Sequence, residues 1–327
     1  MRPSNPLVSI MTPCFNGEKF IQKFLESVLS QTYDNIQLVI VDDGSTDRTK
    51  EVILSNSEKF KSKGILLDYV YQENAGQAAA INKGLSLARG KYLTWPDSDD
   101  YFSEDSIEKR VAILEENENY DFVLNKTHLV NSDKNLLEEL IRPEGTNRNL
   151  FDDMIFEKNA IFHGGAYLVR RDVLMCKLKD GKIFESRAGQ NWQLILPVAY
   201  QNKIKYLDEP LFFVYVREGS HSRGERSFSS EIKKAENHEI ILNEVIDSIN
   251  EIPDEDKKNY KKKIHLKYLR KKLKISSEFE QKKERNVYYS DLKKVDTLTL
   301  KDHMLFLEGS NKLTRKFVKI FRKVRYS

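Results

Sequence analysis

The sequence predicts an α/β fold in which a mixed, mainly parallel sheet lies between helices, with a C-terminal helical extension. In the first hundred residues, short apolar runs alternate four times with segments whose apolar residues recur at helical spacing. This alternation is typical of a parallel sheet covered by helices. From about Arg226 the sequence is rich in Lys and Glu and shows no strand pattern. We therefore predict an α/β domain over residues 1–225 and a helical, basic region over residues 226–327.

The elements of the first hundred residues follow in order. The expected strands are Leu7–Thr12, Ile36–Val41, Ile65–Tyr71 and Lys91–Trp95. The expected helices are Glu18–Ser30, a helix that Ser45 or Thr46 caps and that runs to about Phe60, and Asn74–Arg89, for which Gly90 would be the C-cap.

The rest of the first domain is less regular. Helices are expected over Glu104–Asn117 and Trp192–Tyr200, and strands over Asp121–Val130, Gly165–Arg170, Ile204–Leu207 and Leu211–Val216. Further on, Glu231–Lys274 has a helical apolar period through Ile240, Ile241, Val245 and Ile249.

Composition narrows the cellular context. The chain has 327 residues, of which 39% are apolar, enough for a packed core. Two cysteines, Cys14 and Cys176, do not make a disulfide framework and indicate a reducing compartment. The first residues lack a signal-peptide pattern, and no apolar run approaches the roughly 20 residues that cross a bilayer. We therefore expect a cytoplasmic protein.

Three of the four expected strands end in polar, turn-forming sequence, namely TPCFNGE, DDGSTD and PDSDD. In parallel sheets ligands bind beyond the carboxyl ends of the strands, so these segments should share one rim. The first strand is not followed by GxGxxG, and GxxxxGK[ST] is absent. A dinucleotide fingerprint and an ATPase P-loop are therefore not expected.

The stretch WPDSDD places three carboxylates, Asp97, Asp99 and Asp100, within four residues. Like charges this close repel each other. Mg²⁺ and Mn²⁺ prefer hard oxygen ligands together with substrate phosphates, so an ion shared by Asp97 and Asp99 would relieve the repulsion and hold a diphosphate. The alternative is a surface turn in which Asp and Ser serve turn chemistry. The position after the fourth strand favours the metal.

The chain resembles glycosyltransferase family 2 in two segments, which are VSIMTPCFNGEKFIQKFLESVLSQTYDNIQLVIVDDGSTDRT and ENAGQAAAINKGLSLARGKYLTWPDSDD. Several motifs occur in the family's order and spacing, and the second segment ends in its D-x-D motif. The resemblance extends over about residues 7–218. It implies a GT-A fold, a nucleotide-binding α/β sandwich. It also implies a nucleotide-sugar donor, here most simply a UDP-sugar, and transfer that usually inverts the anomeric centre.

The resemblance implies roles for individual residues. Asp43 would contact the base, as the second Asp of its pair. Asp97 and Asp99 would form the D-x-D pair, with Asp99 the surest metal ligand, and Asp100 would have a structural or acceptor-side role. Further residues of the nucleotide pocket would be Pro13, Phe15, Glu18 and Asn74. The family more commonly has Tyr at the position of Phe15, and the Phe ring can still stack on a base.

The chain departs from the family at the expected general base. An inverting transfer needs a group that takes the acceptor's proton, and the family supplies it from an acidic pair before a Trp. Here Gln190 and Asn191 occupy those positions, and an amide does not accept a proton at ordinary pH. Glu185 is the nearest carboxylate and the candidate base, with Asp180 as second choice. Gln190, Asn191 and Trp192 could still bind a sugar, and Trp192 could equally serve helix packing.

Four further residues, Ile81, His163, His221 and Cys14, lie at or near positions that matter for the site in the family. Ile81 stands where the family usually has Arg, so one phosphate or sugar contact is missing. His163 lies where the family bends near the acceptor site, and His221 could approach the metal or diphosphate. Each His could equally lie in a polar surface loop. Cys14 is interpreted as a structural residue of the pocket wall.

The last residues, 311–327, have the pattern of a basic amphipathic helix. Seven Lys or Arg surround an apolar face formed by Leu313, Phe317, Ile320, Phe321 and Val324. Such a helix lies readily on an anionic membrane, which would place the protein at the inner face of the cell membrane. The alternative is docking on its own domain or on a partner subunit.

These observations predict a metal-dependent glycosyltransferase of the hexosyltransferase type. It would use Mn²⁺ or Mg²⁺ and act on a saccharide or lipid-linked acceptor in cell-surface polysaccharide or glycoconjugate assembly. The alternative is a degenerate transferase domain that acts as a binding or scaffold protein, because the acidic pair is missing. Nucleic-acid binding is not expected, because the basic tail has no aromatic stacking platform beside it.

Overall fold

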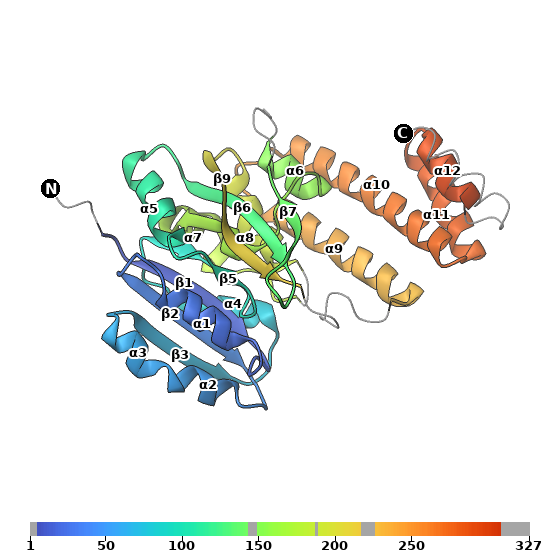
Figure 1. Cartoon of the computed structure of the whole chain (residues 1–327). Helices are drawn as coiled ribbons and strands as arrows, with labels where there is room; N and C mark the ends of the chain where they lie inside the picture. The colour runs from blue at the N-terminus through green and yellow to red at the C-terminus, as the bar shows by residue number, and fades with distance from the viewer. Residues whose placement is uncertain (1–4, 143–148, 187–188, 217–225, 309–327) are drawn as a thin grey trace. The chain divides into compact units, whose positions relative to one another are not determined.

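The computed structural model describes residues 5–142, 149–186, 189–216 and 226–308. The chain divides into two compact units, Met1–Glu218 and Gly219–Ser327 (Figure 1). The predicted boundary at residue 226 stays a prediction, because residues 217–225 lie outside the described ranges.

The first unit, as far as it is described, contains a nine-stranded mixed sheet with the order β3-β2-β1-β4-β8-β6-β9-β5, and β7 pairs with β6. The strands are β1 (Val8–Cys14), β2 (Ile36–Asp43), β3 (Leu66–Gln72), β4 (Tyr92–Thr94), β5 (Tyr101–Phe102), β6 (Phe122–Val130), β7 (Leu136–Leu140), β8 (Tyr167–Arg170) and β9 (Ile204–Tyr215). The strands β3, β2, β1 and β4 are parallel, whereas β8 is antiparallel to both of its neighbours. The predicted mixed α/β sheet is confirmed.

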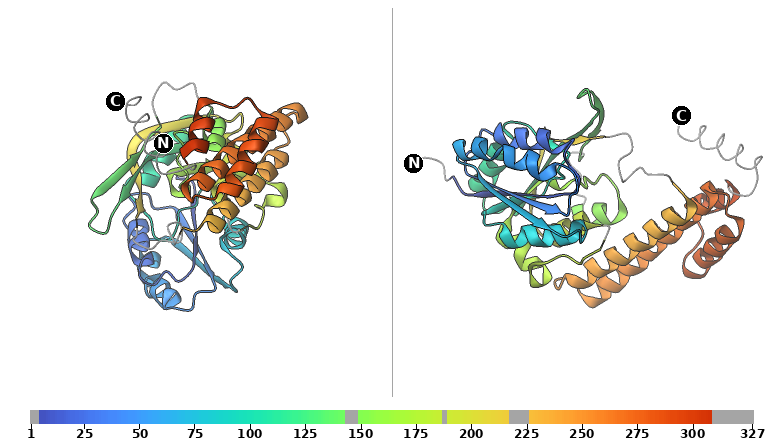
Figure 2. Two further views of the ribbon diagram at one scale, coloured as in Figure 1. Left: turned by 90° about the vertical axis from the view of Figure 1, so that its right-hand side faces the viewer. Right: turned by 90° about the horizontal axis from the view of Figure 1, so that it is seen from below.

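Helices cover both faces of the parallel strands (Figure 2). The first four are α1 (Ile21–Leu29), α2 (Thr49–Ser55), α3 (Ser57–Ser62) and α4 (Gln77–Leu87). Crossovers between parallel strands are right-handed, and the strand order reverses direction after β3, so α4 lies on the face opposite α1–α3. The others are α5 (Ser106–Glu116), α6 (Leu150–Phe156), α7 (Arg171–Lys177) and α8 (Gln190–Ala199), with 3-10 turns at Gly164–Ala166 and Lys179–Gly181.

The expected cap of the second helix is wrong. Helix α2 begins at Thr49, whose backbone N–H donates to the Asp47 carboxylate at 3.0 Å, whereas the Ser45 hydroxyl accepts the backbone N–H of Asn16 at 2.9 Å. The helix also stops at the buried residue Asn56, whose side-chain amide donates to the carbonyl of Val52, and α3 follows as a separate helix.

Gly90 does not act as a C-cap. Helix α4 ends at Leu87, and the residue after it is extended. A Cβ on Gly90 would come within 2.5 Å of the Ser9 nitrogen and 2.8 Å of the Leu7 oxygen. Glycine is needed here because the chain passes close to β1.

The two strands expected over residues 204–216 form one strand, β9. Its pairing with β6 shifts register around Lys126. The polar DEP stretch, residues 208–210, therefore forms an irregularity within the strand and does not end it.

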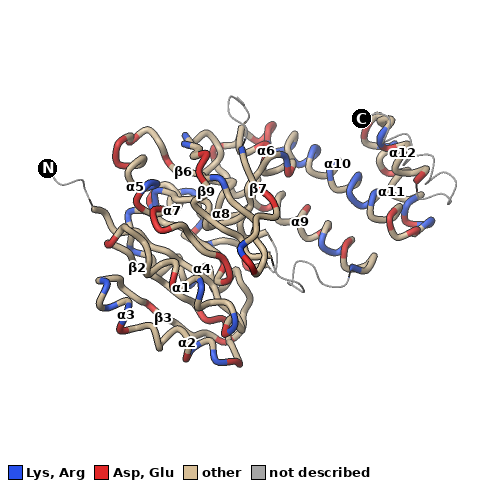
Figure 3. The backbone as a smooth tube through the Cα atoms, viewed as in Figure 1, with Lys and Arg blue, Asp and Glu red and all other residues tan. Residues whose placement is uncertain are grey.

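The second unit contains, among its described residues, α9 (Phe228–Ser248), α10 (Asp254–Glu278), α11 (Lys282–Val295) and α12 (Leu300–Glu308). Helix α10 packs against the other three, and with α11 and α12 it forms a core of Leu269, Leu273, Leu292 and Leu305. Lys and Arg residues recur along α10 (Figure 3), and residues 257–274 contain ten Lys or Arg and no acidic residue.

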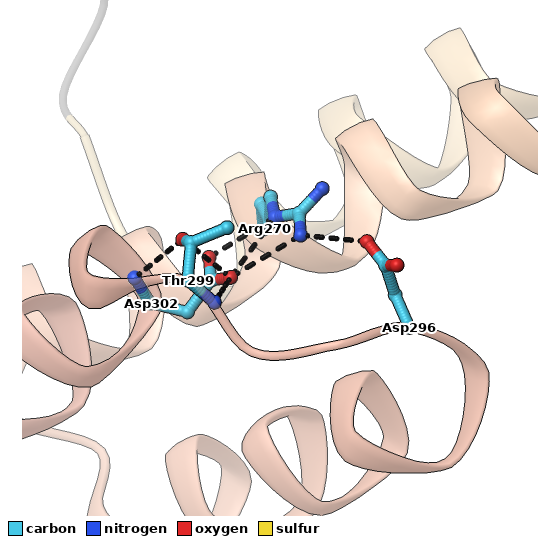
Figure 4. A network of polar contacts seen from close by, with 4 residues as sticks. All are labelled: Arg270, Asp296, Thr299 and Asp302. Atoms are coloured by element: carbon cyan, nitrogen blue, oxygen red, sulfur yellow. Dashed lines mark hydrogen bonds and ion pairs between the residues drawn. The ribbon is translucent and has the colours of Figure 1, made fainter.

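A polar network fixes the start of α12 within this unit (Figure 4). The Asp302 carboxylate, 1% exposed, lies 3.0 Å from the Arg270 guanidinium on α10. It also accepts the backbone N–H and the hydroxyl of Thr299 at 2.9 and 2.8 Å. Because the carboxylate is buried, removal of Arg270 would leave an uncompensated charge. Within the described ranges, no helix is both long and apolar enough to cross a membrane.

Candidate functional site

The carboxyl ends of β1, β2 and β4 lie on one rim, as the sequence predicted. The last residue of β1, Cys14, is paired with Asp42 of β2. Beyond β4, the carbonyl of Pro96 accepts the Thr12 hydroxyl of β1 at 2.9 Å. The three polar segments that follow these strands are therefore neighbours.

Two of these segments, residues 15–18 and 45–49, clasp each other through hydrogen bonds in both directions. The side chains of Ser45, Asp47 and Thr49 accept the backbone N–H groups of Asn16, Glu18 and Gly17, and the side chains of Asn16 and Glu18 accept those of Thr46 and Arg48. The predicted pocket residue Glu18 thus supports this loop pair. Phe15 remains 47% exposed beside it, so its ring is available for stacking.

Asp43 at the end of β2 organises the turn before α4. Its carboxylate accepts the Gln72 amide at 2.7 Å and the backbone N–H groups of Ala75 and Gly76, each at 2.9 Å. The Asn74 side chain donates to the backbone carbonyl of Asp43 at 2.9 Å. These bonds fix Asp43 and Asn74 at the rim, and their contact with a nucleotide stays a prediction, as it does for Pro13 within β1.

Beyond β4, Asp97, Asp100 and His163 form a group in which one ligand atom from each lies within 4.8 Å of the others. Asp97 accepts the Gln77 amide at 3.0 Å, and the buried Asp100 accepts the Tyr215 N–H at 3.0 Å. Burial lowers the pKa of His163 to about 4, so its imidazole is neutral at pH 7 and able to bind a metal. Two carboxylates and a neutral imidazole fit Mn²⁺ or another divalent cation.

Asp99 is not part of this group. The backbone N–H of Asp100 donates to the carbonyl of Asp97 at 3.2 Å, and this turn brings Asp100 back beside Asp97. The role of Asp99 as a metal ligand stays a prediction from the resemblance. Sequence reasoning had placed His163 near the acceptor and had not linked it to Asp97.

His163 reaches the acidic stretch because the next residue has no side chain. A Cβ on Gly164 would lie 2.1 Å from the Trp95 ring and 2.2 Å from the Trp95 carbonyl oxygen. The carbonyl of Gly165 accepts a hydrogen bond at 2.9 Å from Arg110 of α5, which is fully buried. Burial lowers the pKa of Arg110 to about 9. The role of Arg110 was not predicted from the sequence. Its position between Ile107 and Val111, on the apolar face of a helix, was a signal that the side chain is buried.

The candidate base, Glu185, is exposed and lies between α7 and α8. Its carboxylate comes within 3.5 Å of the Asn82 amide on α4. Gln77, which contacts Asp97, lies about one and a half turns earlier on the same helix. Asp180 lies in the exposed turn Lys179–Gly181, and His221 lies outside the described residues.

The three residues at the start of α8 have separate contacts. Gln190 donates to the Ser186 carbonyl at 3.1 Å, and Asn191 accepts the indole N–H of Trp95 at 3.0 Å. Trp192 is 6% exposed and donates to the Met154 carbonyl at 3.2 Å. For Trp192 the geometry favours the packing interpretation.

The sheet order and the acidic stretch after β4 define the class of nucleotide-binding α/β proteins with a GT-A fold. Residues 9–177, more than half of the chain, match the family described as "Glycosyl transferase family 2". The chain belongs to this family, and the predicted family is confirmed.

Relatives and solved structures agree with this assignment. The chain is 30% identical to glycosyltransferase GlyG of Streptococcus pneumoniae over 235 residues, 68% of this chain and 75% of that protein. It is 37% identical over 120 residues, 37% of this chain, to uncharacterized glycosyltransferase RP339 of Rickettsia prowazekii, and spans 36% of that protein's length.

Two solved structures share the fold at 18% identity. S. aureus TarS in complex with UDP-GlcNAc has a TM-score of 0.63 over 92% of this chain and 91% of that chain. The mannosyltransferase PcManGT from Pyrobaculum calidifontis, with GDP-Man and Mn²⁺, has a TM-score of 0.56 over 97% and 84%.

Proposed function

We propose that this chain is a metal-dependent glycosyltransferase that uses a nucleotide-sugar, with a UDP-sugar as favoured donor. The observation that carries the proposal is the group of Asp97, Asp100 and His163 beyond β4, on the rim that also presents the exposed ring of Phe15. The UDP-GlcNAc and the GDP-Man with Mn²⁺ bound to proteins of the same fold support a nucleotide-sugar donor and a divalent cation.

The donor would lie across the ends of β1 and β2. Phe15 would stack on the base and Asp43 would contact its edge, while Pro13, Glu18 and Asn74 shape the pocket. The ion would be held by Asp97, together with Asp99 in the D-x-D arrangement or with Asp100 and His163 in the arrangement of the structure. When bound, it would supply Lewis-acid stabilisation of the diphosphate leaving group.

Glu185 is the proposed general base. In an inverting transfer the acceptor hydroxyl oxygen attacks the anomeric carbon, the bond to the nucleoside diphosphate breaks, and the hydroxyl proton passes to the base. The exposed carboxylate of Glu185 is accessible for this proton. Asp100 is the second catalytic candidate, although it is buried and accepts the Tyr215 N–H.

The acceptor would be a saccharide or a lipid-linked saccharide in cell-surface polysaccharide or glycoconjugate assembly. The basic amphipathic pattern of residues 311–327, which lie outside the described residues, supports peripheral binding at the inner face of the membrane. Docking of this segment on its own chain or a partner is the competing interpretation.

The competing function is a scaffold with a degenerate transferase domain, which the amides Gln190 and Asn191 favour. A thermal-shift panel of UDP-, GDP-, CMP- and dTDP-sugars, each with and without Mn²⁺, separates the two. A donor that raises the melting temperature only with Mn²⁺ supports the transferase. Absence of a shift with every donor would favour the scaffold.

A further inference from the structure

A short irregular segment before α8, residues 182–186, is held by buried amide side chains from two helices. Asn82 of α4 accepts the Ile183 N–H at 2.8 Å and donates to its carbonyl at 3.0 Å. Gln193 of α8 accepts the Phe184 N–H at 2.6 Å and donates to its carbonyl at 3.1 Å. The two amides are 7% and 5% exposed. Two consecutive residues outside any helix or strand therefore have all their backbone polar groups paired by side chains.

This fixed segment presents an aromatic ring to solvent. Ile183 is 5% exposed, whereas Phe184 is 57% exposed, the highest value among the large apolar side chains of the described residues. Burial of a Phe side chain contributes roughly 1.5–3 kcal/mol to the stability of a fold. At Phe184 this contribution is largely absent, although the backbone of the residue is fixed by hydrogen bonds. Rigid aromatic rings beside a few polar groups are typical of ligand-binding pockets.

The segment that carries the ring is held by the same two helices as the site described above. Both helices that hold the segment also contact the acidic stretch, because Gln77 of α4 donates to Asp97 at 3.0 Å and Asn191 of α8 accepts from Trp95 at 3.0 Å. The residue after Phe184 is the candidate base, Glu185.

We propose that Phe184 is a stacking platform for a sugar ring of the acceptor, and that Asn82 and Gln193 are positioning residues that hold it beside Glu185. The inference rests on the proposed transferase function. An aromatic ring offers an apolar surface for the C–H face of a pyranose. The hydroxyls at the edge of the sugar then lie beside the aromatic ring, where a neighbouring carboxylate can accept a hydrogen bond from one of them.

The test measures sugar binding to the full chain by saturation-transfer NMR, in the presence of UDP and Mg²⁺, which is diamagnetic and does not broaden the ligand signals. The probes are the methyl β-glycosides of glucose, galactose and N-acetylglucosamine. We expect Phe184→Ala to weaken binding by about tenfold, the order of one aromatic contact plus its buried area. Phe184→Tyr should retain binding, and Gln193→Ala should weaken it although the ring is still present. The matched control is Leu66→Ala, because Leu66 is 49% exposed and lies at the opposite end of the parallel strands.

A parallel measurement of nucleoside-diphosphate release into water from a panel of UDP-, GDP- and dTDP-sugars, with Mn²⁺, keeps the two proposals apart. The control variant Leu66→Ala, which is outside the candidate site, should leave this release unchanged. Wild-type sugar binding without any release would contradict the proposed function and leave the sugar platform standing. Unchanged sugar binding by Phe184→Ala, or no binding of any glycoside to the wild type, would overturn the platform.

Discussion

Asp97 is the residue on which the candidate metal site depends most, because both arrangements of ligands contain it. We expect Asp97→Ala to weaken Mn²⁺ binding by at least about tenfold. Loss of a residue that only supports a metal ligand already lowers metal affinity by about tenfold or more, and loss of the ligand itself should cost no less. His163→Ala should also weaken binding, because its neutral imidazole lies within 4.8 Å of the carboxylates. Mn²⁺ titration followed by electron paramagnetic resonance measures both. Wild-type affinity in Asp97→Ala would contradict the site.

The two cysteines should differ in reactivity. Burial raises the pKa of the Cys14 thiol to about 12, whereas Cys176 is exposed. The thiolate is the reactive form, so at pH 8 iodoacetamide should modify Cys176 and leave Cys14 unmodified in the folded protein. Mass spectrometry of native and unfolded samples measures this difference. Rapid modification of native Cys14 would contradict its interpretation as a structural residue.

Single residues also show where prediction from the sequence ends. The motif predicted that carboxylates gather after β4, and this is what the structure has. Which carboxylates meet is decided by the turn between Asp97 and Asp100 and by the approach of His163, more than sixty residues away. That approach depends on the space left by Gly164, and a sequence pattern does not display such long-range contacts.

The clasp between residues 15–18 and 45–49 should stabilise the protein in a pH-dependent way. Burial raises the pKa of Asp47, but hydrogen bonds from Thr49 and from the Glu18 N–H outweigh it, so the pKa lies below its usual value. The unfolded state, with a pKa of about 3.9, therefore binds more protons as the pH falls through about 4, and the free energy of unfolding decreases there.

Asp47→Asn tests this contribution. At neutral pH the variant should lose about 1–3 kcal/mol of unfolding free energy, because it leaves hydrogen bonds weakened or unmade. Between about pH 5 and pH 3 its stability should fall less steeply than that of the wild type. Urea unfolding across this range measures both effects. Parallel curves for the two proteins would show that the clasp carries no charge-dependent stability.

Gly164 should be intolerant of any side chain. We expect Gly164→Ala to destabilise the protein by about 1–3 kcal/mol, because the new methyl group would overlap the ring and carbonyl of Trp95. Gly64→Ala is a useful control, since a Cβ there meets no atom within 4 Å, although its positive φ adds backbone strain. Thermal unfolding measures the two variants. Equal stability of Gly164→Ala and the wild type would contradict the close packing.

Elements were predicted best where one apolar period dominates. The parallel strands β1 to β4 and helix α1 follow from such runs. The prediction of two strands in place of β9 was wrong, because the pairing with β6 continues through the irregular stretch. The prediction of a C-cap at Gly90 was wrong, because this glycine is needed where the chain passes close to β1. The amide supports from Asn82 and Gln193 were not predictable, since each joins segments that only the fold brings together.

Charge is unevenly divided along the chain. Residues 1–225 contain 28 Lys or Arg and 34 Asp or Glu, whereas residues 226–327 contain 26 and 16. We expect the full chain to bind vesicles that contain anionic lipid and to lose this binding when residues 311–327 are removed, because each basic group near such a surface adds about 1 kcal/mol. Sedimentation of the full and the shortened chain with anionic and with neutral vesicles measures this binding. Unchanged partitioning of the shortened chain would contradict the membrane interpretation.

The claim on which all of this depends is that the rim of β1, β2 and β4 binds a nucleotide-sugar through a divalent cation. The most direct measurement is release of nucleoside diphosphate from a panel of nucleotide-sugars, with Mn²⁺ and with chelator, by the wild type and Asp97→Ala. We predict release from one class of donor that requires Mn²⁺ and is lost in Asp97→Ala. Release that is unaffected by chelator and by this substitution, or no release from any donor, would contradict the metal-dependent transferase.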